Sequence, residues 1–450
     1  MNLFHLTNKP FSPCELVNET GGLVPLLRQQ GIDDGLVLSV QSSDPACWVT
    51  TWALARSAGH PFMPLAPELA PGQRKRLMEK AGSAVLINIR STTALHQALS
   101  IDSHRTASTP AADTPVRLII HTSGSEGLPR GVMHTQAGLD AASRAACGRL
   151  AFGKDDLWLA CLAPWHIGGI AILERAHYCR ARVLVHPEFS AGQVWRALHE
   201  QPVTHISLVP AMLDRLLEEA ANEVPPPHLR RVLVGGGPLS ETLFQKAAAR
   251  GWPLCVSYGL SEAGSQAATL CTDRGHWTPG DAGPALDGME IRIRDPIGGV
   301  GPIQLRGPMM MYGYLNPVLE GGEGLSDDGW FQTSDIGRLD RRGHLHLLGR
   351  NDDLIVSGGV NIHPTSVERV LHAHPDVVDA AVVGTGDPVF GERVTALFVG
   401  DTDEASLISW CRERLPSAQR PRRFIQLDAL PLRGIGKVDR KRLKMIADQA

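Results

Sequence analysis

A glycine- and hydroxyl-rich loop after a predicted strand is the segment best suited to bind a charged ligand. Residues 121–131 read His-Thr-Ser-Gly-Ser-Glu-Gly-Leu-Pro-Arg-Gly and follow the predicted strand 116–121. Glycines let backbone N–H groups approach an anion, hydroxyls donate to phosphate oxygens, and a guanidinium pairs with them. The loop predicts a polyphosphate site, although a surface turn is the alternative when it is taken alone, and no Gly-Lys-Ser/Thr ending marks a Walker A loop. The candidate binding residues are Thr122, Ser123, Gly124, Ser125, Gly127 and Arg130.

Later segments supply the other groups that a reaction on a nucleotide needs. Three glycines at 235–237 follow an apolar run, which lets a flat ring lie against bare backbone. Lys437, which follows Gly434 and Gly436, can supply a mobile cation. For each segment taken alone, a tight turn or a solvated charge is the alternative.

In this order, the segments resemble the adenylate-forming superfamily of acyl- and aryl-CoA ligases, adenylation domains and luciferases. Residues 122–131 are similar to the family signature TSGSTGxPKG, and 258–262, 330–335 and 431–437 are similar to its YGxTE, WxxTGD and PxxxxGK motifs. The sequence departs from the family with Glu126 and Ser261 in place of threonine, Arg130 in place of lysine and Ser334 in place of glycine. A carboxylate at 126 repels a triphosphate unless a cation intervenes, so this departure bears on pyrophosphate handling.

The resemblance implies a role for each matching residue. Lys437 is implied as the catalytic lysine, Glu262 as the magnesium ligand, and His166 as a residue beside the carboxylate of the acid. For His166, a core histidine satisfied by the backbone is the alternative. Tyr258 is implied to stack on adenine and Asp335 to bind the ribose. The other nucleotide- or CoA-binding residues that it implies are Gly235, Gly236, Gly237, Gly259, Ser261, Arg350, Gly358 and Gly359.

The resemblance further implies ATP, Mg2+ and coenzyme A as cofactors of an acid–thiol ligase that forms AMP. An oxygen of a carboxylic acid would attack the α-phosphorus of ATP, and the acyl-adenylate would then react with a thiol. Asp352 matches the hinge about which the small C-terminal domain of the family rotates between these steps. No protein nucleophile is needed for either step, because orientation and charge neutralisation suffice.

A segment at 203–217 resembles the o-succinylbenzoate-CoA ligases of menaquinone synthesis more than other members of the superfamily. A medium- or long-chain fatty acid or another aryl acid stays open as the substrate, and a carrier-protein thiol stays open as the acceptor. A nucleotide-binding relic without catalysis is disfavoured by the joint presence of Glu262, Asp335 and Lys437. A luciferase-type oxygenase is not distinguished by any residue.

Alternating patterns predict an α/β fold for the first three quarters of the chain. Short β-rich runs alternate with helical patterns, which indicates parallel α/β subdomains. Residues 100–114 are rich in Ser, Thr, Pro, Ala and Asp and predict a loop. From 288 to 348, short strands with Gly- and Asp-rich turns predict a β-rich subdomain. The strands and helix predicted most clearly are 35–40, 84–87, 303–306 and 344–347, and 48–58.

A second unit follows residue 352. Its pattern predicts helices at 365–374 and 404–415 and strands at 377–383 and 394–399. The prediction is therefore an AMP-binding N-terminal domain at 1–351 and a small, mobile α+β lid domain at 352–450 that carries the catalytic lysine.

Composition limits the partners. A formal net charge of −3 gives no general attraction to nucleic acid, and 5% aromatic residues argues against a stacking platform for bases. The partners predicted are a carboxylic acid, ATP and CoA, without nucleic acid. No run of residues is apolar for long enough to span a bilayer, and residues 1–11 lack the apolar core of a signal peptide, which predicts no stable membrane insertion. Symmetry statistics make a homodimer the first oligomer to test.

Cysteine usage suggests a compartment. The eight cysteines are scattered without CxxC or Cys/His ligand spacing, so neither a zinc site nor a disulfide framework is expected. This pattern fits a reducing cytoplasm.

Overall fold

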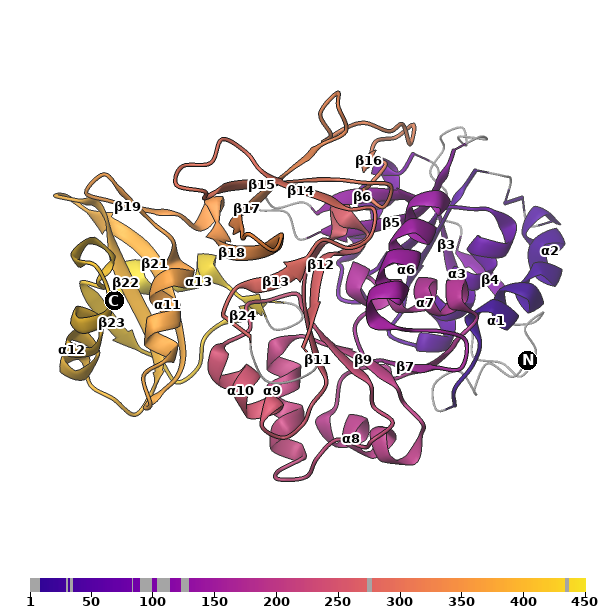
Figure 1. The fold of residues 1–450 in the computed structure, drawn as a ribbon. Coiled ribbons are helices and arrows are strands. Elements are labelled where there is room, and N and C mark those ends of the chain that lie inside the picture. Colours follow the sequence, from indigo (N-terminus) through magenta and orange to yellow (C-terminus); the bar gives the residue numbers. More distant parts are fainter. Residues whose placement is uncertain are drawn as a thin grey trace.

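The computed structural model describes residues 9–29, 31–32, 35–82, 84–89, 99–102, 114–122, 129–272, 277–433 and 437–450. Most of these residues form four sheets with flanking helices (Figure 1). Three sheets are built from residues before 351, and the fourth lies with the C-terminus at one end of the molecule. The predicted class, α/β subdomains with a β-rich subdomain and a small α+β unit, is confirmed.

The first sheet has seven strands in the order β16-β6-β5-β2-β1-β3-β4. Its centre is parallel, whereas β4, β6 and β16 pair antiparallel at the edges. The prediction of a loop at 100–114 is wrong at its start, because β4 pairs with β3 through residue 102. The strands are β1 (Val37–Gln41), β2 (Phe62–Leu65), β3 (Ala84–Ile89), β4 (Leu99–Asp102), β5 (Val116–Thr122), β6 (Arg130–Thr135) and β16 (Gly313–Tyr314).

The helices around this sheet begin and end at sequence signals. Asp44 caps the first turn of α3, Pro45 occupies its first position, and Gly59 ends it in the left-handed region. These helices are α1 (Pro13–Thr20), η2 (Gly21–Leu23), α2 (Val24–Gln29), α3 (Pro45–Ala58), α4 (Pro71–Lys80) and α6 (Gln136–Leu150).

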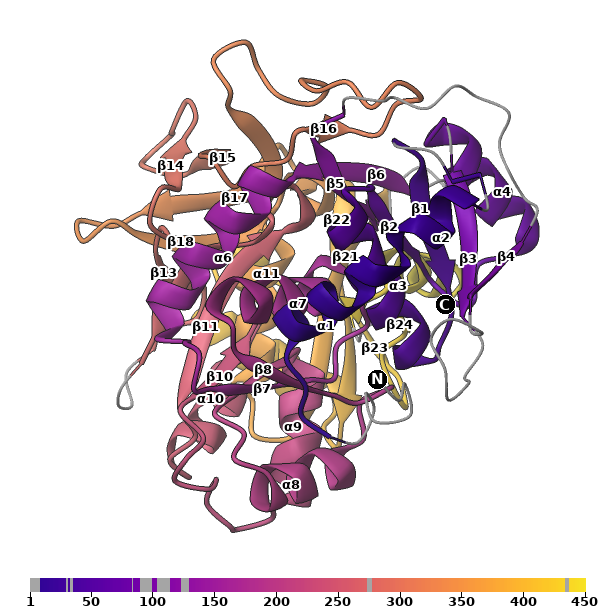
Figure 2. The same cartoon turned by 90° about the vertical axis from the view of Figure 1, so that its right-hand side faces the viewer.

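The second sheet has six strands in the order β12-β11-β10-β9-β7-β8, all parallel except β12. Its strands are β7 (Leu157–Ala160), β8 (Arg182–Val185), β9 (His205–Leu208), β10 (Arg231–Val234), β11 (Leu254–Leu260) and β12 (Ser265–Cys271). Its helices are α7 (Ile167–Cys179), α8 (Ala191–Glu200), α9 (Pro210–Glu219), α10 (Glu241–Ala248) and η3 (Ser261–Ala263). Helices α6 and α7 pack together between the first two sheets (Figures 1 and 2). The carboxyl ends of β10 and β11 therefore face one edge, where ligands bind in open parallel sheets.

The third sheet is antiparallel, as its short strands and turns predict. Its order is β13-β18-β17-β15-β14. The strands are β13 (Asp281–Pro284), β14 (Glu290–Ile293), β15 (Gly301–Arg306), β17 (Phe331–Leu339) and β18 (His344–Arg350).

The fourth sheet, in the order β20-β19-β22-β21 with β23 paired to β22, forms the C-terminal unit. Its predicted helices and strands are present at nearly the predicted residues. The domain boundary at Asp352 lies in η4 and stays a prediction. The elements are η4 (Asn351–Asp353), β19 (Ile355–Ser357), β20 (Val360–Ile362), α11 (Pro364–His372), β21 (Val377–Asp387), β22 (Gly391–Gly400), α12 (Glu404–Arg414), η5 (Ser417–Gln419), β23 (Arg423–Gln426), β24 (Leu432–Arg433), β25 (Lys437–Val438) and α13 (Arg440–Gln449).

The cysteine prediction needs a correction. Cys255 and Cys271 form a disulfide between β11 and β12. They lie directly opposite each other in the antiparallel register, a pairing that their separation of 16 residues does not reveal in the sequence.

A search of the described residues for helices long and apolar enough to cross a bilayer finds none.

Candidate active site

Glu262 is held by an aromatic side chain from a strand that is distant in the sequence. It lies in η3, directly after β11, and Tyr314 of β16 donates a hydrogen bond of 3.0 Å to its Oε1. The guanidinium of Arg130 lies over the Tyr314 ring, 5.1 Å from its centroid. Burial, with the neighbouring Glu262 carboxylate, raises the pKa of Tyr314, so the phenol remains a donor. One fixed carboxylate fits Mg2+, which usually takes one or two protein carboxylates together with substrate phosphates.

A second set of polar contacts begins at Tyr258, four residues before Glu262 in the sequence. The buried Tyr258 donates a hydrogen bond of 2.7 Å to Oδ2 of Asp335 on β17. Arg350, paired opposite Asp335 in the sheet, places a guanidinium nitrogen 3.5 Å from Oδ1 of Asp335 and another 3.0 Å from Oδ2 of Asp352. Burial and the Asp335 carboxylate raise the pKa of Tyr258 well above its usual value. The second and third sheets therefore bring Tyr258, Asp335 and Arg350 together, and their roles toward adenine and ribose stay predictions.

Two glycines of this edge, Gly235 and Gly259, leave no room for a side chain. A Cβ on Gly235 would lie 2.6 Å from Oγ of Ser257, and a Cβ on Gly259 would lie 1.7 Å from the carbonyl oxygen of Ser265. Gly236 has a φ of 79°, a conformation that favours glycine. Bare backbone at 235–237 suits a flat ring, and the bulge at Gly259 directs the chain toward Glu262.

The base of the predicted phosphate loop is closed. Thr122, the last residue of β5, pairs with Arg130, the first residue of β6, so the two ends of the loop lie side by side. Ser123, Gly124, Ser125 and Gly127 lie outside the described residues, and their roles stay predictions. His134 of β6 makes a hydrogen bond of 2.8 Å to the carbonyl oxygen of Ser261, which ties this hairpin to η3. Burial lowers the pKa of His134 to about 4, so the imidazole is neutral at pH 7.

Other predicted residues lie outside these two sets of contacts. His166 stands at the N-cap position of α7, where its side chain makes no capping hydrogen bond, and it is half-buried beside Trp165. Gly358 and Gly359 form the exposed turn between β19 and β20, with φ values of 57° and 78°. The backbone of Lys437 pairs with Arg433 in the ribbon of β24 and β25, and its side chain lies outside the described residues. The meeting of Lys437 with Glu262 therefore stays a prediction.

Two residues that the sequence analysis missed belong to this region. Tyr314 holds Glu262, and its signal was a tyrosine in a glycine-containing run of a chain with only four tyrosines. Arg175 is buried in the apolar helix α7, and its signal was the charged pair Glu174-Arg175 within that helix. A buried charge requires compensation, so a charged pair in an apolar helix deserves a functional explanation.

Arg175 lies beside a small cavity between α6 and α7. Within the part of the chain that the structure describes, it donates to Oγ of Ser265 at 3.1 Å and faces the Trp158 ring at 5.4 Å, with no carboxylate within 4 Å. The neighbouring Glu174 is instead bound by Arg56 and Trp52. Burial lowers the pKa of Arg175 to about 10, which still leaves it cationic at pH 7. The cavity is lined by Leu139, Ala142, Ser143, Ile167, Ala171, Glu174, Arg175 and Gly264.

The family assignment follows from two matches. Residues 23–315 match the model of the AMP-binding enzymes, and residues 366–437 match that of the AMP-binding enzyme C-terminal domain. The chain belongs to the AMP-binding enzyme family. The predicted membership among adenylate-forming acid–thiol ligases is thereby confirmed, together with the enzyme class.

Relatives within the AMP-binding enzymes include the 2-succinylbenzoate–CoA ligase of Bacillus mycoides, which is 36% identical over 338 residues, 74% of this chain and 70% of the relative. The o-succinylbenzoate CoA synthetase of Bacillus subtilis with its acyl-adenylate intermediate superposes with a TM-score of 0.80 at 29% identity, over 96% of this chain and 92% of that one. The ATP-bound MatB of Rhodopseudomonas palustris superposes with a TM-score of 0.81 at 26% identity, over the same shares. The Bacillus subtilis enzyme has also been solved with ATP and a magnesium ion, in agreement with the cofactors predicted.

Proposed function

We propose that this AMP-binding enzyme activates o-succinylbenzoate with ATP and transfers the acyl group to coenzyme A. The observation that carries the proposal is the hydrogen bond from Tyr258 of the second sheet to Asp335 of the third, with Glu262 held by Tyr314 four residues after Tyr258. A metal, an adenine and a ribose would need these residues close together. Relatives that share this arrangement of domains carry the name of that ligase.

In the first step, an oxygen of the substrate carboxylate forms a bond to the α-phosphorus, and the bond to the pyrophosphate oxygen breaks. Asp335 would accept hydrogen bonds from the ribose hydroxyls, and Arg350 would orient that carboxylate. Glu262 would hold the magnesium ion, which supplies charge neutralisation to the phosphates. Arg130 and the loop after Thr122 would bind the pyrophosphate portion, and Lys437 would neutralise charge as the transition state forms.

In the second step, the thiolate of CoA attacks the acyl carbonyl carbon and AMP leaves. Asp352 would serve as the hinge that exchanges Lys437 for the β19–β20 turn. Gly358 and Gly359 present backbone without side chains there, which suits a narrow pantetheine arm.

The choice of acid rests on Arg175. The substrate o-succinylbenzoate has two carboxylates, so one remains charged after the other is activated. The small α7 cavity is lined by Ile167, the residue after His166, and by Arg175, whose buried guanidinium has no acidic partner within 4 Å among the described residues. An anionic guest would compensate that charge. A fatty acid offers no second carboxylate, so Arg175 favours the dicarboxylate over that alternative.

Pyrophosphate release with a pair of matched acids tests the proposal. We expect the wild-type protein with ATP and MgCl2 to prefer o-succinylbenzoate over 4-oxo-4-phenylbutanoate, which lacks the ring carboxylate, by about tenfold or more in kcat/KM, or ~1.4 kcal/mol. Arg175→Met should abolish this preference while the KM for ATP stays within about twofold. Addition of CoA should convert the adenylate to a thioester. Activity with a fatty acid but none with o-succinylbenzoate would overturn the substrate assignment.

The remaining predictions concern the location of the enzyme and its oligomeric state. A cytoplasmic location fits an enzyme that consumes ATP and CoA, and we propose it together with a homodimer as the first oligomer to test. Sedimentation of the purified chain distinguishes a dimer from a monomer.

A further inference from the structure

Two ion-pair chains end on neighbouring carboxylates of η4. Arg350, which also contacts Asp335, pairs with Asp352. Arg440 pairs with Asp353, its Nε lying 3.1 Å from Oδ2. Arg350 belongs to β18 of the third sheet, whereas Arg440 begins α13 near the C-terminus. The short helix is therefore held from the large domain at one residue and from the C-terminal unit at the next.

Arg440 is anchored more firmly on its own side. Its guanidinium forms a two-point pair with Glu368 of α11, at 2.8 and 3.0 Å, and donates to the carbonyl oxygen of Val382 at 2.8 Å. The Glu368 side chain is only 11% exposed and also accepts from the backbone N–H of Val382 at 2.8 Å. A planar guanidinium with both carboxylate oxygens and a carbonyl in place has a fixed orientation.

Arg440 lies close in the sequence to Lys437, so its ion pair with Asp353 also affects the segment that carries Lys437. Arg440 follows Lys437 by three residues, with Asp439 between them as the N-cap of α13. The Arg440 side chain, which pairs with Asp353 of η4, thus lies at the base of the segment that carries Lys437. Lys444, one turn further along the same helix, pairs instead with Glu392 at 3.2 Å and is half-exposed.

We propose that Arg440 is a positioning residue that couples the hinge turn to the Lys437 segment. When the chain rotates at Asp352, the Asp353–Arg440–Glu368 unit moves Lys437 together with the body of the C-terminal unit. Loss of the coupling leaves Lys437 poorly placed for adenylation. It leaves the nucleotide site of the large domain intact and affects thioester formation less, because that step uses the β19–β20 turn. This inference rests on the proposed function.

The two half-reactions of full-length variants test the role of Arg440. We expect Arg440→Gln to lower kcat for acid-dependent ATP–pyrophosphate exchange by about 10- to 100-fold, with the KM for ATP within about twofold. Thioester formation from supplied acyl-adenylate should stay within about threefold of the wild type. Arg440→Lys should restore part of the exchange rate, and Asp353→Asn, which leaves the Glu368 pair intact, should reduce exchange by about three- to tenfold.

Lys444→Gln is the matched control, because it removes another ion pair of α13 that does not reach η4. Its two rates should stay within about twofold of the wild type. Equal loss of both half-reactions in folded Asp353→Asn protein, or no loss of exchange in folded Arg440→Gln protein, would overturn the proposal. The wild-type rate with o-succinylbenzoate tests the proposed function, whereas the ratio of variant to wild type, with any acid that the wild type accepts, tests Arg440.

Discussion

Two polar clusters lie at opposite ends of the second sheet, and they differ in where their hydrogen bonds end. The ligand-edge cluster consists of Tyr258, Glu262, Tyr314, Asp335 and Arg350, and its bonds converge on the carboxylates of Glu262 and Asp335. Glu262 follows the end of β11, at the edge where a parallel sheet binds ligands, and Asp335 lies within β17 of the antiparallel third sheet.

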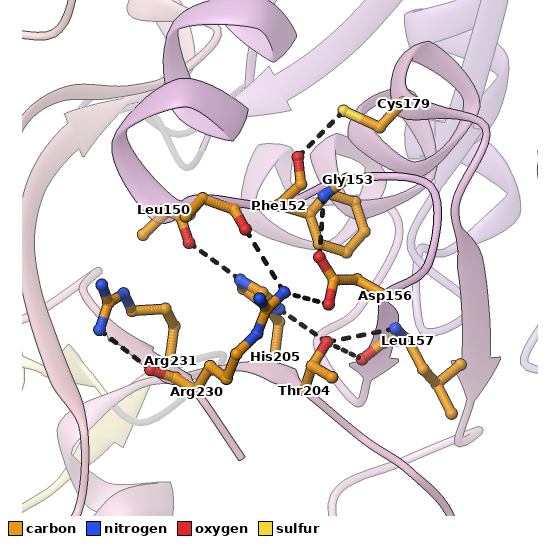
Figure 3. Close-up of polar contacts among 11 residues, drawn as sticks. Leu150, Phe152, Gly153, Asp156, Leu157, Cys179, Thr204, His205, Arg230 and Arg231 are labelled. Carbon is orange, nitrogen blue, oxygen red and sulfur yellow. Dashed lines mark hydrogen bonds and ion pairs between the residues drawn. The ribbon is translucent and has the colours of Figure 1, made fainter. Parts of the chain in front are cut away.

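The closed cluster, Asp156, Thr204, His205 and Arg230, lies where β7, β9 and β10 begin (Figure 3). His205 is fully buried, with Nε2 at 3.0 Å from the carbonyl oxygen of Leu150 and Nδ1 at 2.9 Å from the hydroxyl of Thr204. Asp156 is bound by Arg230 and by the backbone N–H of Gly153. The polar groups of the closed cluster therefore form hydrogen bonds with one another and with the backbone.

The comparison teaches that a buried histidine or aspartate does not by itself mark a site. In the closed cluster, side chains form hydrogen bonds with backbone N–H and carbonyl groups where the strands begin, which contributes to stability. In the ligand-edge cluster, tyrosines hold carboxylates that still have the capacity to accept a ligand. Changes in the first cluster should therefore alter folding, and changes in the second should alter the reaction.

Glu262→Gln should have the largest effect. Replacing the magnesium carboxylate with an amide should lower kcat for ATP–pyrophosphate exchange by about 100-fold or more, which corresponds to ~3 kcal/mol. The Tyr314 hydrogen bond can be kept by the amide oxygen, so the free energy of unfolding should change little. Glu218→Gln, an exposed acid on α9, is the matched control and should be neutral. A rate within about threefold of the wild type for Glu262→Gln would remove Glu262 from the metal site.

His205→Gln should show the opposite pattern, with a loss of about 2 kcal/mol in unfolding free energy at pH 7 and an unchanged KM for ATP. Burial lowers the pKa of His205 to about 4, below the ~6.5 of an unfolded chain. The unfolded state therefore binds the proton more readily, and this contribution to stability is complete above pH 6.5 and is lost as the pH falls toward 4. It amounts to about 3 kcal/mol.

Denaturant unfolding from pH 4 to 8 checks this expectation. The wild-type protein should lose stability more steeply below pH 6.5 than His205→Gln, and the exposed His199→Gln should follow the wild type. Parallel pH profiles for wild type and His205→Gln, or a large rise in the KM for ATP, would contradict the structural role.

Tyr314→Phe should have the smallest effect, because it removes one hydrogen bond and keeps the ring under Arg130. A hydrogen bond to a charged group contributes about 1.5 kcal/mol or more, so the exchange rate should fall by roughly tenfold, with a higher requirement for Mg2+. Titration of MgCl2 measures it, with Tyr312→Phe of the same segment as the control. An unchanged magnesium requirement would show that Tyr314 does not orient Glu262.

Much of the fold could be predicted because local patterns determine it. The strand at Val116–Thr122 and the helix at Glu404–Arg414 lie almost where alternation and helical periodicity place them. The antiparallel edges and the Cys255–Cys271 disulfide could not be predicted, since both depend on which strands become neighbours. A one-dimensional pattern contains the face of a strand but not its partner.

The candidate active site also contains residues that local patterns predict and residues that only the tertiary structure shows. Tyr258, Glu262, Asp335 and Arg350 were predicted by motif, and the structure places each in one of two sets of polar contacts. Tyr314 was missed because it reaches Glu262 from strand β16, 52 residues further along the sequence, a contact with no local signature. The phosphate loop at 123–128 and the side chain of Lys437 lie outside the described residues, so those predictions remain for experiment.

A crystal structure of the wild-type protein with ATP and MgCl2 tests the central claim most directly. The account predicts the ribose hydroxyls within hydrogen-bonding distance of Asp335 and a magnesium ion bonded to an oxygen of Glu262 at about 2.1 Å. A nucleotide bound at another edge of the molecule, with Asp335 and Glu262 touching neither ribose nor metal, would contradict it.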